Sequence, residues 1–352
     1  MRKKITALLL AAIMLLALTA CGTTAQPAST EAPAADAAAD APAEASAEET
    51  ALDYPTQNIS WIVPVAAGAG VDLVTRQVVD MLDLGVNFSI ENITGGQQAI
   101  GTKEALSRPA DGYTLFSIAN AGLLTQPIIN PDVGYTVDDI IALAMLTPDV
   151  LATVTVNNDS DIKTMEDWVE FVTTHDEFSF AVPNSGGFGH MSCLAVLKGL
   201  GANYGKAVAY DGNNGAYQAV LNGEVDFAIL DDNFIYNYSN QGTCNVLVAL
   251  SSTKSPYLPD VEPLSSAYPV DKLDALGGWK IACVSADTPP EIVEFLKTKL
   301  DELLLSDEYA KYLEENGYGS FNGKILSIDE LSGVINDAVA LYSEILVEAG
   351  LM

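Results

Sequence analysis

From Tyr54 onward, short apolar runs alternate with amphipathic segments, and this alternation constrains the fold more than any other feature of the sequence. Apolar runs rich in Val and Ile predict strands, whereas apolar residues spaced three or four apart predict helices. The predicted strands are Ile59–Val65, Asn87–Ile90, Tyr113–Ile118, Val150–Val156, Glu177–Val182, Lys206–Tyr210, Val225–Leu230, Asn245–Leu250 and Trp279–Val284. The predicted helices are Val71–Leu82, Gln98–Leu106, Met165–Thr174, Met191–Leu200, Gly215–Asn222, Pro290–Leu305, Asp307–Asn316 and Ile328–Glu348. This alternation is typical of an α/β fold whose largely parallel sheets are covered by helices on both faces.

Two largely apolar segments, 140–156 and 277–284, divide this series. We expect them to cross between two α/β lobes, so that the chain leaves the first lobe and later returns to it. The predicted boundaries are residues 54–153 for the first part of lobe 1, 154–278 for lobe 2 and 279–352 for the return to lobe 1.

The first 20 residues have the pattern of an export signal. Basic residues at positions 2–4 precede the apolar run Ile5–Leu18, which leads into the sequence LTAC at 18–21. A basic start, a short apolar stretch and a small residue before the cut are typical of a signal peptide rather than a membrane span. LTAC resembles the lipobox of bacterial lipoproteins, which implies cleavage before Cys21 and attachment of a membrane lipid to its thiol. The alternative is an ordinary signal peptide in which Cys21 is incidental.

Acidic residues dominate the rest of the chain. The sequence has 16 Lys and Arg against 47 Asp and Glu, a formal net charge of -31. This balance argues against a nucleic-acid partner and against binding to anionic lipid through basic residues, since both require a basic face. Residues 22–53 contain seven of the acids but no Lys, Arg or aromatic residue. Because charge repulsion and low apolar content oppose folding, we expect segment 21–53 to be a flexible tether.

A first ligand-binding loop is predicted at residues 64–72, PVAAGAGVD, between a strand and a helix. Small residues let a ligand approach backbone N–H groups, and the helix N-terminus favours an anion such as a carboxylate or phosphate. Asp72 and Arg76 are spaced to form an ion pair on the helix surface. A dinucleotide fingerprint is disfavoured, because Leu73 occupies the position of its third glycine.

A second loop with the same properties lies at residues 184–190, NSGGFGH, again between a strand and a helix. Two anion-receptive loops more than 100 residues apart indicate one in each lobe, facing a shared cleft. The alternative is two unrelated strand-to-helix turns. Neither loop contains a Lys or Arg, so we expect backbone dipoles to bind the anion.

The residues needed for catalysis or metal binding are sparse. His175 and His190 are the only histidines, so we expect no metal site and no cofactor. Ser185 is not in a G-x-S-x-G motif, and nothing orients His190 as a base. We therefore expect no enzyme, with His190 acting as a cap or ligand donor at a helix start. Asp231 and Asp232 could form a carboxylate pair, although a solvated turn is the commoner explanation. Three cysteines leave open one disulfide plus a free thiol, or three buried thiols: Cys193, Cys244 and Cys283.

Seven segments, in family order, resemble the solute-binding receptors of tripartite tricarboxylate transporters, the Bug or TctC family. They are residues 54–76, 108–116, 184–190, 222–233, 246–261, 277–293 and 342–351. The resemblance implies a two-lobed, type II periplasmic-binding-protein fold, a Venus flytrap with two crossover strands. It implies that the two loops grip a ligand carboxylate through backbone N–H groups and bridging waters. The implied ligands are small organic acids, including di- and tricarboxylates, and amino acids, which the receptor passes to the membrane subunits of the transporter.

The residues that we expect to contact the ligand are Val65, Ala66, Ala67, Gly68, Ala69, Gly70, Asp72, Asn120, Asn184, Ser185, Gly187, Phe188, Gly189, His190, Tyr210, Asp211 and Asp231. The sequence departs from the family at two of these places. Val65, Ala66 and Ala67 replace the usual aromatic residue and Pro, and Asp211 replaces a Lys or Arg. If Asp211 faces the cleft, the change favours a ligand with an ammonium group or a single carboxylate; if it faces solvent, it only adds surface acidity.

The sequence thus predicts a lipid-anchored, extracytoplasmic solute receptor that is monomeric and binds no nucleic acid. Its predicted partners are the ligand, the transporter's membrane subunits and membrane lipid through Cys21. The alternative is a lipoprotein that presents a carboxylate or amino acid to a membrane sensor kinase.

Overall fold

The computed structural model describes residues 52–148, 150–256, 258–270 and 273–352. The predicted signal peptide, the lipobox with Cys21 and the acidic segment up to residue 51 lie outside the described residues. Within the part of the chain that is described, no helix combines the length and the apolar character that a membrane crossing needs.

The first sheet has five strands in the order β2-β1-β3-β10-β4. They are β1 (Ile59–Val63), β2 (Phe88–Asn92), β3 (Thr114–Ile118), β4 (Ile140–Met145) and β10 (Ile281–Ser285). Helices that follow its strands are α1 (Gly70–Met81), α2 (Ala99–Ser107), α8 (Pro290–Leu304) and α9 (Asp307–Glu315). Successive side chains of a strand point to opposite faces, and Trp61 and Ile62 are both fully buried, in different core clusters. The sheet is therefore covered on both faces, as the apolar runs predict.

The second sheet also has five strands, in the order β7-β6-β8-β5-β9. They are β5 (Ala152–Asn157), β6 (Ser179–Val182), β7 (Lys206–Ala209), β8 (Phe227–Asp231) and β9 (Cys244–Ala249). Its helices are α4 (Met165–Thr174), α5 (Phe188–Gly199), α6 (Gly212–Leu221) and α7 (Asp232–Ser239). Ile229 and Leu230 of β8 lie in separate core clusters, so helices cover both faces here too.

The expectation of largely parallel sheets is wrong for half of the strand pairs. In the first sheet β10 runs antiparallel to β3 and β4, and in the second β5 runs antiparallel to β8 and β9. β5 and β10 are the strands that the chain forms immediately after it passes from one sheet to the other. A strand that enters a sheet directly, without a returning helix, is free to run opposite to its neighbours.

The two segments that connect the sheets lie side by side. Val150 and Gly278 form an antiparallel bridge, and the N–H of Leu146 donates to the carbonyl of Lys280 at 2.7 Å. The first connection is shorter than the predicted segment 140–156, since β4 and β5 occupy most of it. Paired backbone at the junction gives the two sheets a common, two-stranded connection.

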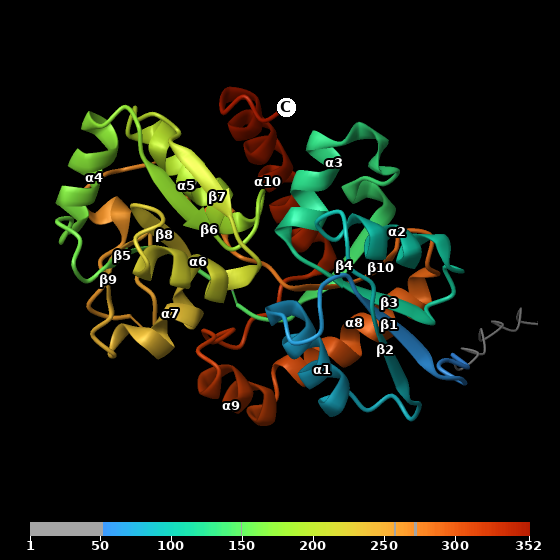
Figure 1. The fold of residues 1–352 in the computed structure, drawn as a ribbon. Helices are drawn as coiled ribbons and strands as arrows, with labels where there is room; N and C mark the ends of the chain where they lie inside the picture. Colours follow the sequence, from blue (N-terminus) through green and yellow to red (C-terminus); the bar gives the residue numbers. More distant parts are fainter. Residues whose placement is uncertain (1–51, 149, 257, 271–272) are drawn as a thin grey trace, which may run out of the picture. The chain divides into compact units, whose positions relative to one another are not determined.

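Helix α10 (Ile328–Glu348), red in Figure 1, packs against elements of both sheets. Its apolar face contacts β4 of the first sheet and α5 beside the second. At its C-terminal end, Lys198 of α5 forms ion pairs with Glu344 and Glu348 at 2.8 and 2.7 Å. The Ser327 hydroxyl accepts from the N–H of Glu330 in a capping box, which fixes where α10 begins.

The sequence prediction missed several short elements between Asn120 and Asn130 and after β8. These include the π-helix Ala121–Thr125, α3 (Gln126–Ile129) and α7. Four 3₁₀ turns complete the described elements: Pro131–Val133, Val137–Asp139, Leu264–Ser266 and Leu273–Leu276.

Candidate functional site

The first loop leads from β1 into α1 and is held by the carboxylate of Asp72. Asp72 accepts hydrogen bonds from the N–H of Gly68 at 2.7 Å, Nε of Arg76 at 2.9 Å and Nδ2 of Asn92 at 2.8 Å. Burial opposes its ionisation, but the hydrogen bonds from Arg76, Gly68 and Asn92 outweigh it and lower the pKa. The predicted ion pair with Arg76 is confirmed, although Asp72 is buried rather than on the helix surface. Its carboxylate is thus occupied in shaping the loop.

The N-terminus of α1 presents backbone donors that no side chain caps. The cap residue Ala69 makes no side-chain hydrogen bond, and the N–H groups of Gly70, Val71 and Asp72 have no acceptor among the described residues. Helix starts leave such groups unpaired and carry the positive end of the helix dipole. The stretch from Ala66 to Gly68 is exposed, so a ligand can reach the loop. The geometry is suited to a carboxylate or another small anion.

The second loop, from β6 into α5, repeats this arrangement. Gly187 is the cap residue of α5, it also lacks a side-chain cap, and the N–H groups of Phe188, Gly189 and His190 have no acceptor within the described chain. The loop is closed by the N–H of Gly186, which donates to Nδ1 of His190 at 3.0 Å.

His190 is therefore a structural acceptor rather than a base. Its side chain is 5% exposed, and burial lowers its pKa to about 4. The neutral ring accepts at Nδ1, which leaves Nε2 as its donor. The expectation of a cap at the helix start is close to this arrangement, except that the ring bonds a loop N–H four residues earlier.

Both helix starts lie over one short extended segment, residues 278–280. A Cβ on Gly278 would come within 2.6 Å of the Phe188 ring, and a Cβ on Gly70 would lie 3.5 Å from Cε of Lys280. Gly278 and Lys280 are two residues apart, about 7 Å in an extended chain, and side chains so spaced share a face. Residues at both helix starts thus contact the same connecting segment, and the shared cleft stays a prediction. The second loop is also held from the π-helix, where the Thr125 hydroxyl donates to the carbonyl of Gly186.

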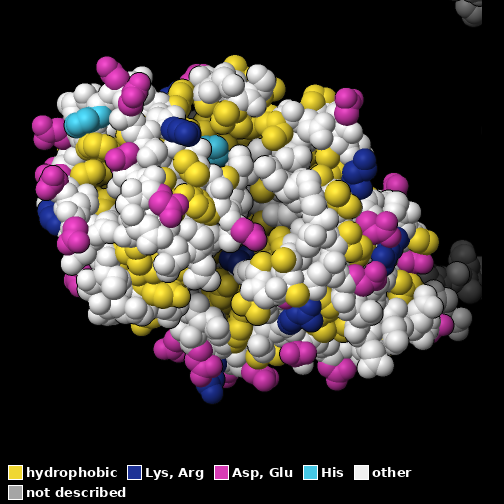
Figure 2. All heavy atoms as spheres, viewed as in Figure 1, with side chains coloured by type: hydrophobic (Ala, Val, Ile, Leu, Met, Phe, Trp, Pro, Cys, Tyr) yellow, Lys and Arg dark blue, Asp and Glu magenta, His cyan; other side chains and the backbone are white. Residues whose placement is uncertain are grey.

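Lys280, which the sequence reasoning did not single out, lies beside the first helix start. It is 9% exposed, its ammonium lies 4.9 Å from the centroid of the Tyr318 ring, and it makes no side-chain hydrogen bond or ion pair in the described chain. Burial lowers its pKa, partly offset by Asp231 and Asp232. Figure 2 shows a hollow in this face with a largely covered basic side chain next to an acidic one. A single Lys in the apolar run at 277–284 was the available sign of a buried charge.

Asp231 and Asp232 do not form a solvated turn, and that interpretation is wrong. Helix α7 starts at Asp232, which is 4% exposed and accepts from the N–H groups of Leu151 at 3.1 Å and Asn233 at 2.8 Å. Burial raises the pKa of Asp232 to about 6. Burial also raises the pKa of Asp231, against the opposing effects of Lys280 and Asn213. Asp231, a predicted ligand residue, therefore lies near the charge of Lys280.

Three other predicted ligand residues either form hydrogen bonds elsewhere in the described chain or lie outside the two helix starts. Asn120 uses its amide on the connecting segment: Nδ2 donates to the carbonyl of Gly277 at 3.0 Å, and Oδ1 accepts from the N–H of Trp279 at 2.8 Å. The hydroxyl of Tyr210 donates to Glu224 at 3.2 Å. Asp211 is exposed at the start of α6 and its side chain makes no cap hydrogen bond.

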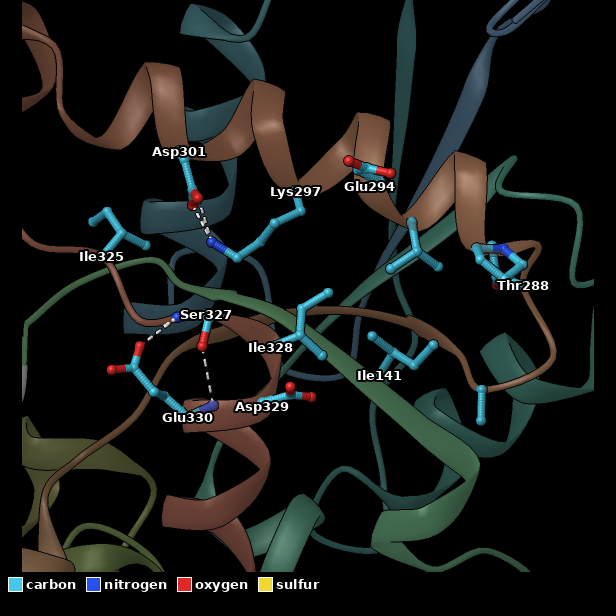
Figure 3. A pocket seen from close by; sticks show the side chains of 13 residues that line it. Ile141, Thr288, Glu294, Lys297, Asp301, Ile325, Ser327, Ile328, Asp329 and Glu330 are labelled. Atoms are coloured by element: carbon cyan, nitrogen blue, oxygen red, sulfur yellow. Dashed lines mark hydrogen bonds and ion pairs between the residues drawn. The ribbon is translucent and has the colours of Figure 1, made fainter. Parts of the chain in front are cut away.

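Two cavities of about 600 Å³ lie elsewhere in the described structure, and neither is lined by the loops. Figure 3 shows one of them, between α8 and the start of α10, where Lys297 pairs with Asp301. No group of three or more His, Cys, Asp or Glu side chains among the described residues is placed to hold a metal. Of the alternatives for the cysteines, the structure has three buried, unbonded thiols: Cys193, Cys244 and Cys283.

Over residues 74–351 the sequence matches TctC, the tripartite tricarboxylate transporter family receptor. The chain belongs to this family. A curated relative, the UPF0065 protein in the TAR-I ttuE-ttuC' intergenic region of Agrobacterium vitis, is 24% identical over 73% of this chain and 75% of its own.

Two solved structures from Rhodopseudomonas palustris share the TctC fold. Rpa4515 with adipate is 21% identical and has a TM-score of 0.73, covering 85% of this chain and 99% of its own. MatC with bound malate is 20% identical and has a TM-score of 0.70, covering 83% of this chain and 100% of its own. The predicted fold, two-lobed and of type II, is confirmed. TctC family members are extracytoplasmic solute-binding receptors rather than enzymes.

Proposed function

We propose that this TctC receptor binds a small carboxylate at the helix starts of α1 and α5. The observation that carries the proposal is that a residue at each of these two uncapped N-termini contacts the segment 278–280. Each helix offers three backbone N–H groups without an acceptor in the described chain, and these groups belong to opposite lobes. A carboxylate bound by both would join the lobes through several charge-assisted hydrogen bonds.

The relatives support the ligand class. MatC and Rpa4515, which share the fold, hold malate and adipate, both of which are dicarboxylates. Backbone donors bind a carboxylate whatever side chains surround them, so they fit many small acids. The rest of the ligand is then selected by the side chains that line the site.

We further propose that the lobes are residues 54–153 with 279–352, and 154–278, and that they close about the paired connections. The bridge between Val150 and Gly278 lies where such a hinge would bend. Ligand that contacts both lobes would shift the population toward the closed state. The receptor would act as a monomer and deliver its ligand to the membrane subunits of a tripartite tricarboxylate transporter.

The anchoring of the receptor is proposed from the sequence alone. Cleavage before Cys21 and lipid attachment would hold the protein outside the cytoplasm, on the acidic tether 21–53. Labelling of expressing cells with a lipid precursor would test this, with Cys21→Ser as the unlabelled control.

Binding is tested by titration calorimetry with mono-, di- and tricarboxylates and amino acids. We expect at least one to bind, and Gly70→Leu to weaken it at least tenfold, because the new side chain would cover the free N–H groups and meet Lys280. Gly333→Leu, in α10 with open space around it, is the matched control and should retain wild-type affinity. Gly187→Leu is a second test, although a Cβ there would lie only 1.9 Å from Oδ1 of Asn184. Unchanged affinity in both loop variants would refute the assignment of the cleft.

A further inference from the structure

We propose that Lys280 and Asp231 select a zwitterionic ligand, with Lys280 binding the carboxylate seated on α1 and Asp231 binding a cationic amine. The inference rests on the proposed carboxylate site and names the class of acid that fits it.

Lys280 carries a buried charge that the described residues do not satisfy. Its side chain is more than nine-tenths buried, and no carboxylate or carbonyl lies within hydrogen-bonding distance of its ammonium. The Tyr318 ring, 4.9 Å away, supplies only a cation–π contact. Buried charges are costly unless they are paired, so the ammonium lacks an anion that a ligand could provide.

The position of Lys280 determines where that anion would lie. Its Cε is 3.5 Å from the Cβ position of Gly70, the first residue of α1. The ammonium and the free N–H groups of Gly70 and Val71 therefore approach one another from the connecting segment and the first lobe. A carboxylate between them would receive charge-assisted hydrogen bonds from both, at the positive end of the helix dipole.

Asp231 ends β8, and Asn233, two residues on, packs against Gly317, the neighbour of the Tyr318 whose ring contacts Lys280. It forms no ion pair with Lys280 within 4.0 Å, yet it is close enough to act on the Lys280 charge. Its backbone N–H is held by Oδ1 of Asn213 at 3.1 Å, which fixes the residue in place. The two opposite charges are thus near but not in contact, so a ligand lying between them would meet a cation on one side and an anion on the other.

The polarity of this space discriminates between acids. A zwitterion places its carboxylate toward Lys280 and its ammonium toward Asp231, so that both protein charges gain a partner. A dicarboxylate brings its second negative group toward Asp231 and the buried Asp232. Repulsion between like charges in a buried site then opposes binding and gives specificity by exclusion.

Calorimetry with matched ligand pairs tests the inference, because each pair exchanges an ammonium for a second carboxylate. The pairs are 3-aminopropanoate and succinate, 4-aminobutanoate and glutarate, and alanine and methylmalonate. With the wild-type chain we expect the zwitterion of at least one pair to bind at least tenfold more tightly than its diacid.

The variants separate the two roles. Lys280→Met should weaken binding of the zwitterion at least tenfold. Asp231→Asn should weaken binding of the zwitterion and strengthen binding of the diacid, so that the difference between the two affinities decreases. Lys311→Met and Asp260→Asn make the same charge changes at exposed positions and should leave both affinities unchanged. Circular dichroism checks that each variant is folded. If Lys280→Met does not fold, Asp231→Asn still tests the inference.

A wild-type preference for the diacids, or an unchanged preference in Asp231→Asn, would overturn the inference and leave the carboxylate receptor intact. If the wild-type chain bound none of these acids and no other carboxylate, the proposed function itself would fail.

Discussion

Acidification should destabilise this receptor through His190, whose ring is buried against the second loop. In the native chain Nδ1 of His190 accepts the N–H of Gly186, and a protonated ring could not do so. Burial lowers the native pKa to about 4 from an ordinary value of 6.5. The unfolded chain therefore takes up a proton at a higher pH than the native chain.

The magnitude follows from the two pKa values. Above pH 6.5 the neutral ring contributes its full stability, and between pH 6.5 and about 4 the free energy of unfolding falls by about 1.4 kcal/mol for each pH unit. Between pH 7 and 4.5 the loss is about 2 kcal/mol. Asp232 acts in the opposite direction, because its native pKa of about 6 lies above its ordinary 3.8 and protonation then favours the native state. The total change in wild type is thus smaller than the contribution of His190.

A variant isolates this contribution. In His190→Asn the Oδ1 atom takes the place of Nδ1 as acceptor but does not titrate, whereas Asp232 is retained. Urea denaturation at pH 7 and pH 4.5 gives the free energy of unfolding of both proteins. We expect wild type to lose about 2 kcal/mol more than His190→Asn over this range. His175→Asn, which removes the exposed histidine at the end of α4, should behave as wild type does. Equal losses in wild type and His190→Asn would refute the reasoning.

Three further predictions concern the packing around the site. Asp72→Asn should cost about 2 kcal/mol in urea denaturation and weaken ligand binding, because its one amide oxygen cannot accept from Arg76, Gly68 and Asn92 together, and its amide nitrogen only donates. Gly278→Ala should cost about 1–3 kcal/mol and shift α5, since the added Cβ would overlap the Phe188 ring, whereas Gly333→Ala in the open helix should gain about 1 kcal/mol. Lys198→Met should leave the urea midpoint nearly unchanged despite its two ion pairs, because both glutamates are about half exposed and water screens them.

Local elements were the best predicted part of the fold. The predicted bounds of Met165–Thr174 and Ile328–Glu348 are those of α4 and α10, and in both helices a capping box marks the first turn. The start of α5 was placed at Met191, three residues late, because its first turn consists of loop-like residues. The first turn of α5 is held to the loop by the hydrogen bond from the N–H of Gly186 to Nδ1 of His190, which a local pattern does not predict.

Strand direction could not be predicted from residue patterns. β5 and β10 are buried on both faces, as parallel strands between helices are, and their entry from the other sheet accompanies their antiparallel direction. The π-helix at Ala121–Thr125 depends on similar distant partners, including the contact of Thr125 with Gly186. Periodicity records which residues are buried, but not what lies against them.

For the candidate site, sequence reasoning named the two loops and Asp231 but not Lys280. Small residues before a helix predict free N–H groups wherever they occur, so both loops could be found from sequence. Lys280 and Asp231 act on one another's charge although they are distant in the sequence, and no local pattern brings them together. Lys280 and Gly278 are two residues apart, and each lies beside one of the two helix starts.

The acidity of the chain acquires a role once the site contains both signs of charge. With a net charge of -31, the protein's long-range potential repels a dicarboxylate, whereas a zwitterion carries no net charge and is not repelled. Salt screens this potential over about 8–10 Å, so it acts on approach and not on contacts inside the site. The outer surface and the Lys280–Asp231 pair then favour the same ligand class by independent means. It follows that added salt should raise the association rate of a diacid and leave that of a zwitterion unchanged, and equal salt dependence for the two would mean that the surface charge does not take part in selection.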